Sequence, residues 1–163
     1  LGGRSFQFPI DVAWDSHGRL YVANRNAAIS RITILNLDED YVGEFGGPGE
    51  SEGTITWPAS IAIDRSDAIY VSDQQTHFIK VYDPEGKFVT KWGGHGSAEG
   101  ELREPSGLAF DDDDDLYVVD AGNNRIQKFA SDGRFLLAWG SRGSDETPNT
   151  TIRVGSRDGL AGA

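Results

Sequence analysis

One motif occurs three times along this chain of 163 residues, and it constrains the fold more than any other feature. Each copy has a proline, a short apolar alternation, an aspartate, a turn and an aliphatic-Tyr-Val triplet. The prolines Pro9, Pro58 and Pro105 are separated by 49 and 47 residues. A fixed period of this length indicates a repeat architecture. The copies are FPIDVAWDSHGRLYVAN (8–24), WPASIAIDRSDAIYVSD (57–73) and EPSGLAFDDDDDLYVVD (104–120).

The second half of each unit repeats as well. SRITIL (30–35), HFIKVY (77–82) and NRIQKF (124–129) align at a constant spacing of 47, and each is followed by EFGG, KWGG or AWGS. Alternation of Val, Ile, Tyr and Phe with polar residues, broken by Gly, Asp, Asn and Pro, predicts four short strands per unit. No window has the pattern of an amphipathic helix. In the third unit we expect strands at about 106–110, 115–119, 125–130 and 135–139.

Four antiparallel strands repeated every 47 residues or so predict an all-β fold, a β-propeller built of four-stranded blades. The pattern P-x-x-(I/V/L)-A-x-D, (L/I)-Y-V-x-D, R-I-x-x-F and W-G-x-x-G resembles the NHL repeat, and the resemblance covers residues 8–143. It implies a six-bladed propeller. It implies no single function, because the family includes lyases, lactonase relatives, receptor modules and substrate-recognition domains of ubiquitin ligases.

The expected organisation is three blades plus a short remainder. Residues 1–143 hold the NHL-type blades, with repeats at about 8–56, 57–103 and 104–143, and residues 144–163 form a tail or the degenerate start of a fourth blade. A six-bladed ring of this period needs roughly 280 residues. Two alternatives therefore stay open: the chain is a piece of a larger propeller, or two copies associate to complete one. Three blades alone are also expected to leave unpaired strand edges.

Composition excludes some classes of partner. The formal net charge of −11 repels phosphate backbones, so we expect no nucleic-acid binding. No apolar run approaches the roughly 20 residues of a membrane helix, so we expect no membrane span. The chain has neither cysteine nor methionine. The missing initiator favours a piece of a longer protein and is compatible with a processed extracytoplasmic one, while the compartment stays undetermined.

No motif supports metal binding, so we predict no cofactor, with calcium or zinc left open as alternatives that no motif supports. Five consecutive carboxylates, Asp111 to Asp115, lie at a predicted hairpin turn and lack the spacing of a calcium loop. We expect a solvated acidic hairpin there. His77 and His95 belong to loops at one end of the blades, whereas His17 belongs to a turn at the opposite end. The three imidazoles are therefore not expected to form a zinc site.

The sequence contains no group of residues typical of a catalytic site. One enzymatic branch of the family is the peptidyl-hydroxyglycine amidating lyase, in which a zinc-binding His follows the repeat's proline. Here Ile10, Ala59 and Ser106 follow the prolines. There is no G-x-S-x-G motif and no cysteine nucleophile. A metal-dependent propeller enzyme, lyase-like or lactonase-like, stays open as the alternative if its key residues lie outside these blades.

The polar loops between the second and third strand of each unit are the candidate binding surface. Their first position recurs, but the following positions differ between units, as expected of a recognition face on a rigid framework. We therefore predict a binding or scaffolding module whose partner is a protein or peptide. The predicted binding residues are Arg25, Asn26, Gln74, Gln75, His77, His95, Asn123 and Asn124.

One charged pair is predicted to be structural. Asp120 and Arg125 stand five residues apart, and their equivalents are Asn24 and Arg31 in the first unit and Asp73 and Phe78 in the second. A position that recurs in every blade is expected to stabilise the blade, whereas a substrate site would need the pair at one place only. We expect Asp120 to accept backbone N–H groups and Arg125 to pair with it or with a neighbouring blade.

Overall fold

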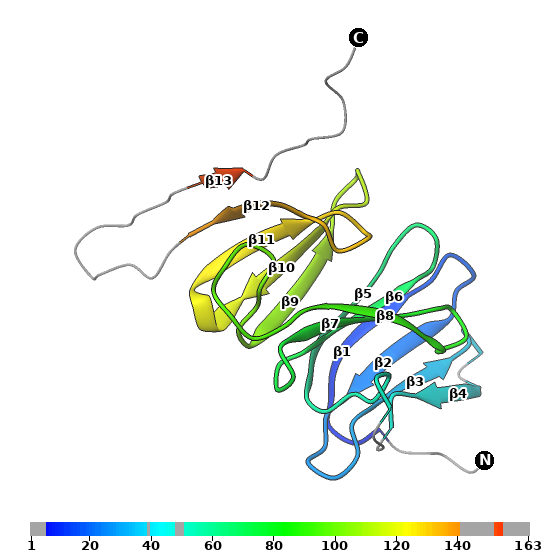
Figure 1. Cartoon of the computed structure of the whole chain (residues 1–163). Helices are drawn as coiled ribbons and strands as arrows, with labels where there is room; N and C mark the ends of the chain where they lie inside the picture. The colour runs from blue at the N-terminus through cyan, green and yellow to red at the C-terminus, as the bar shows by residue number, and fades with distance from the viewer. Residues whose placement is uncertain (1–5, 39, 48–50, 141–151, 155–163) are drawn as a thin grey trace.

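The computed structural model describes residues 6–38, 40–47 and 51–140, together with the backbone of 152–154. Three antiparallel sheets follow one another along the chain, and each is one blade (Figure 1). Blade 1 contains β1 (Pro9–Trp14), β2 (Leu20–Asn24), β3 (Arg31–Leu35) and β4 (Tyr41–Phe45). Blade 2 contains β5 (Pro58–Ile63), β6 (Ile69–Asp73), β7 (Phe78–Tyr82) and β8 (Phe88–Gly93). Blade 3 contains β9 (Pro105–Phe110), β10 (Leu116–Asp120), β11 (Arg125–Phe129) and β12 (Phe135–Trp139).

The predicted all-β propeller architecture is confirmed. Each of the four strands expected in the third unit begins and ends within one residue of the prediction. The one helical element among the described residues is a single 3-10 turn, η1 (Ala121–Asn123), between β10 and β11. In every blade the strands pair in sequence order, as a meander.

The blades pack face to face, and their first strands β1, β5 and β9 lie side by side. One apolar core lies between blades 1 and 2 and is built from Tyr21, Ile32, Ile61 and Tyr82, among others. A second lies between blades 2 and 3. The inner strands of blade 2 therefore bury alternate side chains against blade 1 and against blade 3. This explains why both faces of the central strands are apolar.

The surfaces left open by three blades differ from the prediction of open strand edges. Because neighbouring blades contact through their faces, the surfaces without a partner among the described residues are one face of blade 1 and one face of blade 3. A further strand, β13 (Ile152–Val154), pairs antiparallel with β12 along the outer edge of the third sheet. The rest of residues 144–163 lies outside the described residues, so the nature of this segment and the domain boundaries stay predictions.

The aspartate after each first strand builds the turn that follows it. Asp15 Oδ1 accepts the N–H groups of His17 and Arg19 at 3.0 and 2.8 Å, and Asp64 and Asp111 repeat this arrangement in the other blades. A side-chain carboxylate that caps its own turn explains the recurrence of Asp in the motif. We call the end of the blades that carries these turns the hairpin end.

The acidic run 111–115 forms the predicted hairpin, but it is not only solvated. Lys128 Nζ on β11 lies 2.8 Å from Asp111 Oδ2 and 2.9 Å from Asp115 Oδ2. The hydrogen bond from Lys128 lowers the pKa of Asp111 to about 2. The pKa of Lys128 is correspondingly raised.

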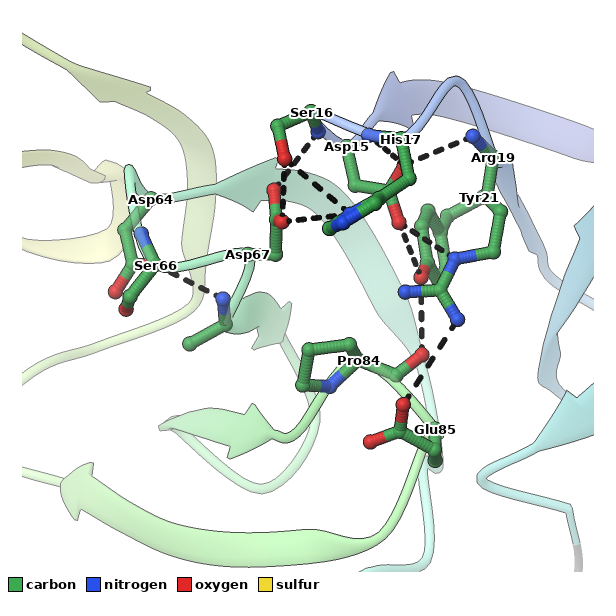
Figure 2. A network of polar contacts seen from close by, with 11 residues as sticks. Asp15, Ser16, His17, Arg19, Tyr21, Asp64, Ser66, Asp67, Pro84 and Glu85 are labelled. Atoms are coloured by element: carbon green, nitrogen blue, oxygen red, sulfur yellow. Dashed lines mark hydrogen bonds and ion pairs between the residues drawn. The ribbon is translucent and has the colours of Figure 1, made fainter.

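Contacts at the hairpin end also join neighbouring blades (Figure 2). Asp67, in blade 2, accepts hydrogen bonds from the Ser16 N–H at 2.8 Å and from the Ser16 hydroxyl at 2.7 Å. Tyr21 donates its hydroxyl to the carbonyl of Pro84 at 2.9 Å. The next pair of blades repeats both contacts: Arg65 N–H donates to Asp114, and Tyr70 donates to the Ser131 carbonyl.

Candidate binding surface at the loop end

The candidate surface lies at the opposite end of the blades, which we call the loop end. It is formed by the loops that connect the second and third strands (25–30, 74–77 and 121–124) and by the segments that enter each first strand. Five of the eight predicted binding residues line two adjoining hollows there: Arg25, Asn26, Gln74, Gln75 and His77.

Trp57 lies between the two hollows and lines both. The first hollow has a volume of about 480 Å³ and is mainly apolar; the second has a volume of about 530 Å³ and is lined by polar and apolar surface in similar amounts. The guanidinium of Arg25 lies 5.1 Å from the centre of a Trp57 ring, which is the distance of a cation–π contact. The first hollow is lined by Phe8, Pro9, Ile10, Arg25, Asn26, Ala27 and Trp57, and the second by Trp57, Gln74, Gln75, His77 and Glu104.

A buried carboxylate holds the backbone of Trp57 in place. Asp73, at the end of β6, accepts the N–H of Thr56 at 2.8 Å and the N–H of Trp57 at 3.1 Å. Lys80 Nζ donates to the same carboxylate at 2.7 Å. Burial alone would raise the pKa of Asp73, but the hydrogen bonds from Lys80 and the backbone outweigh it and lower the pKa below its ordinary value. Asp73 is therefore a charged anchor beneath the surface.

His77 is fixed rather than free. Its Nδ1 accepts the N–H of Glu104 at 2.9 Å, and its own N–H donates to the Asp73 carbonyl. Its backbone has a φ of 64°, which is uncommon for a residue with a side chain. The ring of His95 packs edge-on against it with centroids 4.8 Å apart. The prediction that His77 and His95 lie at the same end is confirmed, although His95 lines neither hollow.

Asn123 and Asn124 support the loop and line neither hollow. The Asn123 amide donates to the Asp120 carboxylate and, at 2.8 Å, to the Gly96 carbonyl. Asn124 adopts a left-handed conformation with φ 53° and closes the 3-10 turn. The polar differences between repeats identified loop positions but did not separate ligand-facing amides from those that hold the loop.

The structural roles predicted for Asp120 and Arg125 are confirmed. Asp120 Oδ1 accepts the N–H of Arg103 at 2.7 Å, and Arg125 Nε lies 2.7 Å from Asp120 Oδ2. The rest of the guanidinium donates to carbonyls in the segment that enters blade 3, those of Ser97, Ala98 and Glu101. The pair is buried beneath the loop and takes no part in the hollows.

Sequence reasoning missed Phe8 and Trp57. Both occupy the position immediately before the repeat's proline, where the third blade has Glu104. Phe8 and Glu104 have φ values of 53° and 50°, and Phe8 is largely exposed. An aromatic residue before the proline in two repeats out of three was the available signal, but only the packing of neighbouring blades shows that it faces a hollow.

His17 lies at the hairpin end, as predicted, beside Ser16 and Asp67. These three residues do not form a catalytic relay, because Ser16 donates directly to Asp67 and both approach the same ring nitrogen, His17 Nδ1. A relay needs the base between nucleophile and acid, with one ring nitrogen toward each. Among the residues that the structure describes, no three His, Cys, Asp or Glu side chains are grouped so as to hold a metal ion. The same part of the chain contains no helix long and apolar enough to cross a membrane.

Comparison with solved structures gives the fold. Virginiamycin B lyase from Staphylococcus aureus, in a catalytically inactive form solved with quinupristin, superposes with a TM-score of 0.63 at 14% identity, over 86% of this chain and 44% of that one. A streptogramin B lyase superposes with a TM-score of 0.64 at 16% identity, over 96% and 57%. Hydrazine synthase from Kuenenia stuttgartiensis gives 0.63 at 16%, over 84% and 38%. The chain thus spans between about two fifths and three fifths of these neighbours.

Comparison at the level of sequence is narrower. No curated protein matches the chain. The model of the NHL repeat matches residues 102–129, which begin just before β9 and end at the last residue of β11. Together with the three meander sheets and the propeller neighbours, this match shows β-propeller blades, of which residues 102–129 match the NHL repeat.

Proposed function

We propose that this protein is a binding module that recognises a protein or peptide at the loop end of its blades. The observation that carries the proposal is Trp57, held by a buried carboxylate between two hollows whose other side chains differ from blade to blade. Trp and Arg are enriched among the residues that dominate binding energy in protein interfaces, and here Arg25 stacks on Trp57.

The two hollows suit a peptide better than a single small molecule. They are neighbours of different character, one lined by Phe8, Pro9 and Ile10 and the other by the Gln74 and Gln75 amides. An extended peptide would place an apolar side chain in the first and satisfy the amides with its backbone in the second. Because the loop backbones are tied to buried groups, little ordering entropy would be lost on binding.

The test is selection of peptides from a displayed random library on the immobilised full chain, followed by calorimetry with the selected peptides. Trp57→Ala is expected to weaken binding by about tenfold or more. Because Trp57 also packs against the fold, the Gln74→Ala/Gln75→Ala double variant provides an independent disruption of the second hollow. Lys87→Ala, an exposed change at the hairpin end, is the matched control and should bind like the wild type.

The proposal is abandoned if the selected peptides bind all three variants with the wild-type affinity, since the loop end would then not be their site. It also fails if repeated selections yield no peptide that binds the folded chain.

A further inference from the structure

The two internal blade contacts define which positions a blade uses to bind the blade that follows it. A cross-strand pair on the second and third strands is central: Ala23 with Ile32 in blade 1, and Ser72 with Ile79 in blade 2. All four side chains are fully buried against the next blade. An aromatic residue at the end of the fourth strand adds to each contact, with Phe45 on Tyr82 at 4.7 Å and Trp92 on Phe129 at 4.6 Å.

Blade 3 has the same positions, but there they are open. Val119 and Ile126 form the equivalent cross-strand pair and are 40% and 41% exposed. Trp139, the equivalent of Phe45 and Trp92, stacks at 5.5 Å on Tyr117 of its own blade. The face that in blades 1 and 2 binds a following blade is thus apolar in blade 3, and none of the residues that the structure describes packs over it. We call it the open face of blade 3.

Blade 1 presents the complementary surface. Blades 2 and 3 receive the preceding blade on their first strand, where Ile61 is 4% exposed and Leu108 packs against the core. The equivalent residue of blade 1, Val12, is 53% exposed, and its neighbour Trp14 is 73% exposed. Exposed apolar side chains gathered on one sheet face mark an interaction surface. We call this the open face of blade 1.

We propose that the open face of blade 3 packs on the open face of blade 1 in a second copy of this chain. The contact would continue the two internal ones, with Val119 and Ile126 covered by Val12 and its neighbours. It is heterologous, since the two surfaces differ, and it closes when two copies exchange it twice. Two copies of three blades then complete a ring of six. This proposal is independent of the ligand at the loop end.

The intermolecular contact lacks one polar anchor that both internal contacts have. Ser16 and Arg65 donate their N–H groups to Asp67 and Asp114 of the following blade. The aligned position in blade 1 is Gly18, with φ 80°, which offers no carboxylate to Asp112 of a second copy. Association between copies should therefore be weaker than packing between blades and should depend on concentration.

Sedimentation equilibrium of the full chain over a hundredfold range of concentration tests the contact. We expect a monomer–dimer equilibrium. Val119→Asp should raise the dissociation constant at least tenfold, because it places a charge in the apolar contact. Val89→Asp is the matched control: Val89 is also exposed, at 59%, but it lies on β8, the outer strand of blade 2, and its substitution should leave the dimer unchanged.

A second variant is designed to strengthen the contact between copies, whereas Val119→Asp is designed to weaken it. Gly18→Asp supplies the missing carboxylate in the left-handed conformation that Asp67 and Asp114 already adopt at φ 64°. The added Cβ would lie 2.9 Å from the end of the Leu37 side chain, which is exposed and can move. The ring contains this contact twice, so two restored hydrogen bonds at about fivefold each should tighten the dimer about 25-fold. A monomer at every concentration, or a dimer that Val119→Asp leaves intact, overturns the proposal.

Discussion

Blades 2 and 3 end their second strand on a buried carboxylate, whereas blade 1 ends it on a buried amide. Asp73 and Asp120 each accept N–H groups from the segment that enters their own blade and each contacts a cation, Lys80 or Arg125. Asn24 donates its amide to the Val22 carbonyl and to the Thr33 hydroxyl, both at 3.0 Å. Its Oδ1 is buried and accepts no hydrogen bond within the described structure.

The difference shows that this position and its partner on the third strand vary together. Thr33, Lys80 and Gln127 occupy the same place in the three blades. A buried carboxylate needs a compensating donor or cation, while the N–H group of a buried amide can donate to a hydroxyl. The carboxylate blades therefore secure their entry segment electrostatically, and blade 1 does not.

The largest expected effect comes from removing the cation in blade 2. Lys80→Met should lower the free energy of unfolding by about 3–5 kcal/mol, because it leaves Asp73 buried without its partner. Urea denaturation followed by tryptophan fluorescence measures the loss. The Asp73→Asn/Lys80→Met double variant should recover part of it. If Lys80→Met alone costs less than about 1 kcal/mol, the account of this pair as a charged anchor is wrong.

A smaller effect is expected when blade 1 is given the carboxylate of the other blades. Asn24→Asp should cost about 2–3 kcal/mol, because Thr33 supplies no positive charge and Arg31, the equivalent of Arg125, is paired with Glu44. The Asn24→Asp/Thr33→Lys double variant should regain at least half of that loss, as the pair would then match blade 2. Thermal unfolding of the two variants and of Thr33→Lys alone makes a complete cycle. Strict additivity of the single changes would contradict coupling between the two positions.

The smallest effect concerns the acidic hairpin of blade 3 and depends on pH. The folded pKa of Asp111 is about 2, below the roughly 3.9 of an unfolded chain. Its contribution is therefore present above about pH 4 and is lost as the pH falls toward 2. For a partly exposed ion pair we expect about 0.5–1 kcal/mol. Asp111→Asn should flatten this part of the stability profile between pH 4 and 2, with Asp132→Asn as an exposed control; a profile that stays unchanged would refute the assignment.

Much of the fold followed from the repeat. Period-2 alternation placed the strands, and recurrence of the position separated Asp120 and Arg125 from a catalytic pair. The open faces were not foreseen, because strand pairing can be inferred from local pattern while blade packing joins residues about 50 positions apart. The ion pairs of Asp111 and Asp115 were missed for a different reason: Lys128 belongs to the same blade, but it meets them only through the register of β10 with β11.

The candidate surface was half predictable. Loop positions that differ between units identified Gln74, Gln75 and Arg25 correctly as neighbours of a hollow. Trp57 lines both hollows, yet nothing in the neighbouring sequence distinguishes it from an aromatic residue of the core. Its position depends on Asp73, which is 16 residues away.

The segment between blades 2 and 3 has a consequence for synthesis on the ribosome. Residues 97–103 are held by Asp120, Arg125 and Gln127, all of which come later in the sequence. As the chain emerges, this linker lacks Asp120 until the second strand of the next blade has been made, and it lacks Arg125 and Gln127 until the third has been made. The strands of each blade thus pair with one another, but the linker that leads into blade 3 is hydrogen-bonded only after the residues that hold it have been synthesised. This linker therefore becomes ordered later than residues that follow it in the sequence.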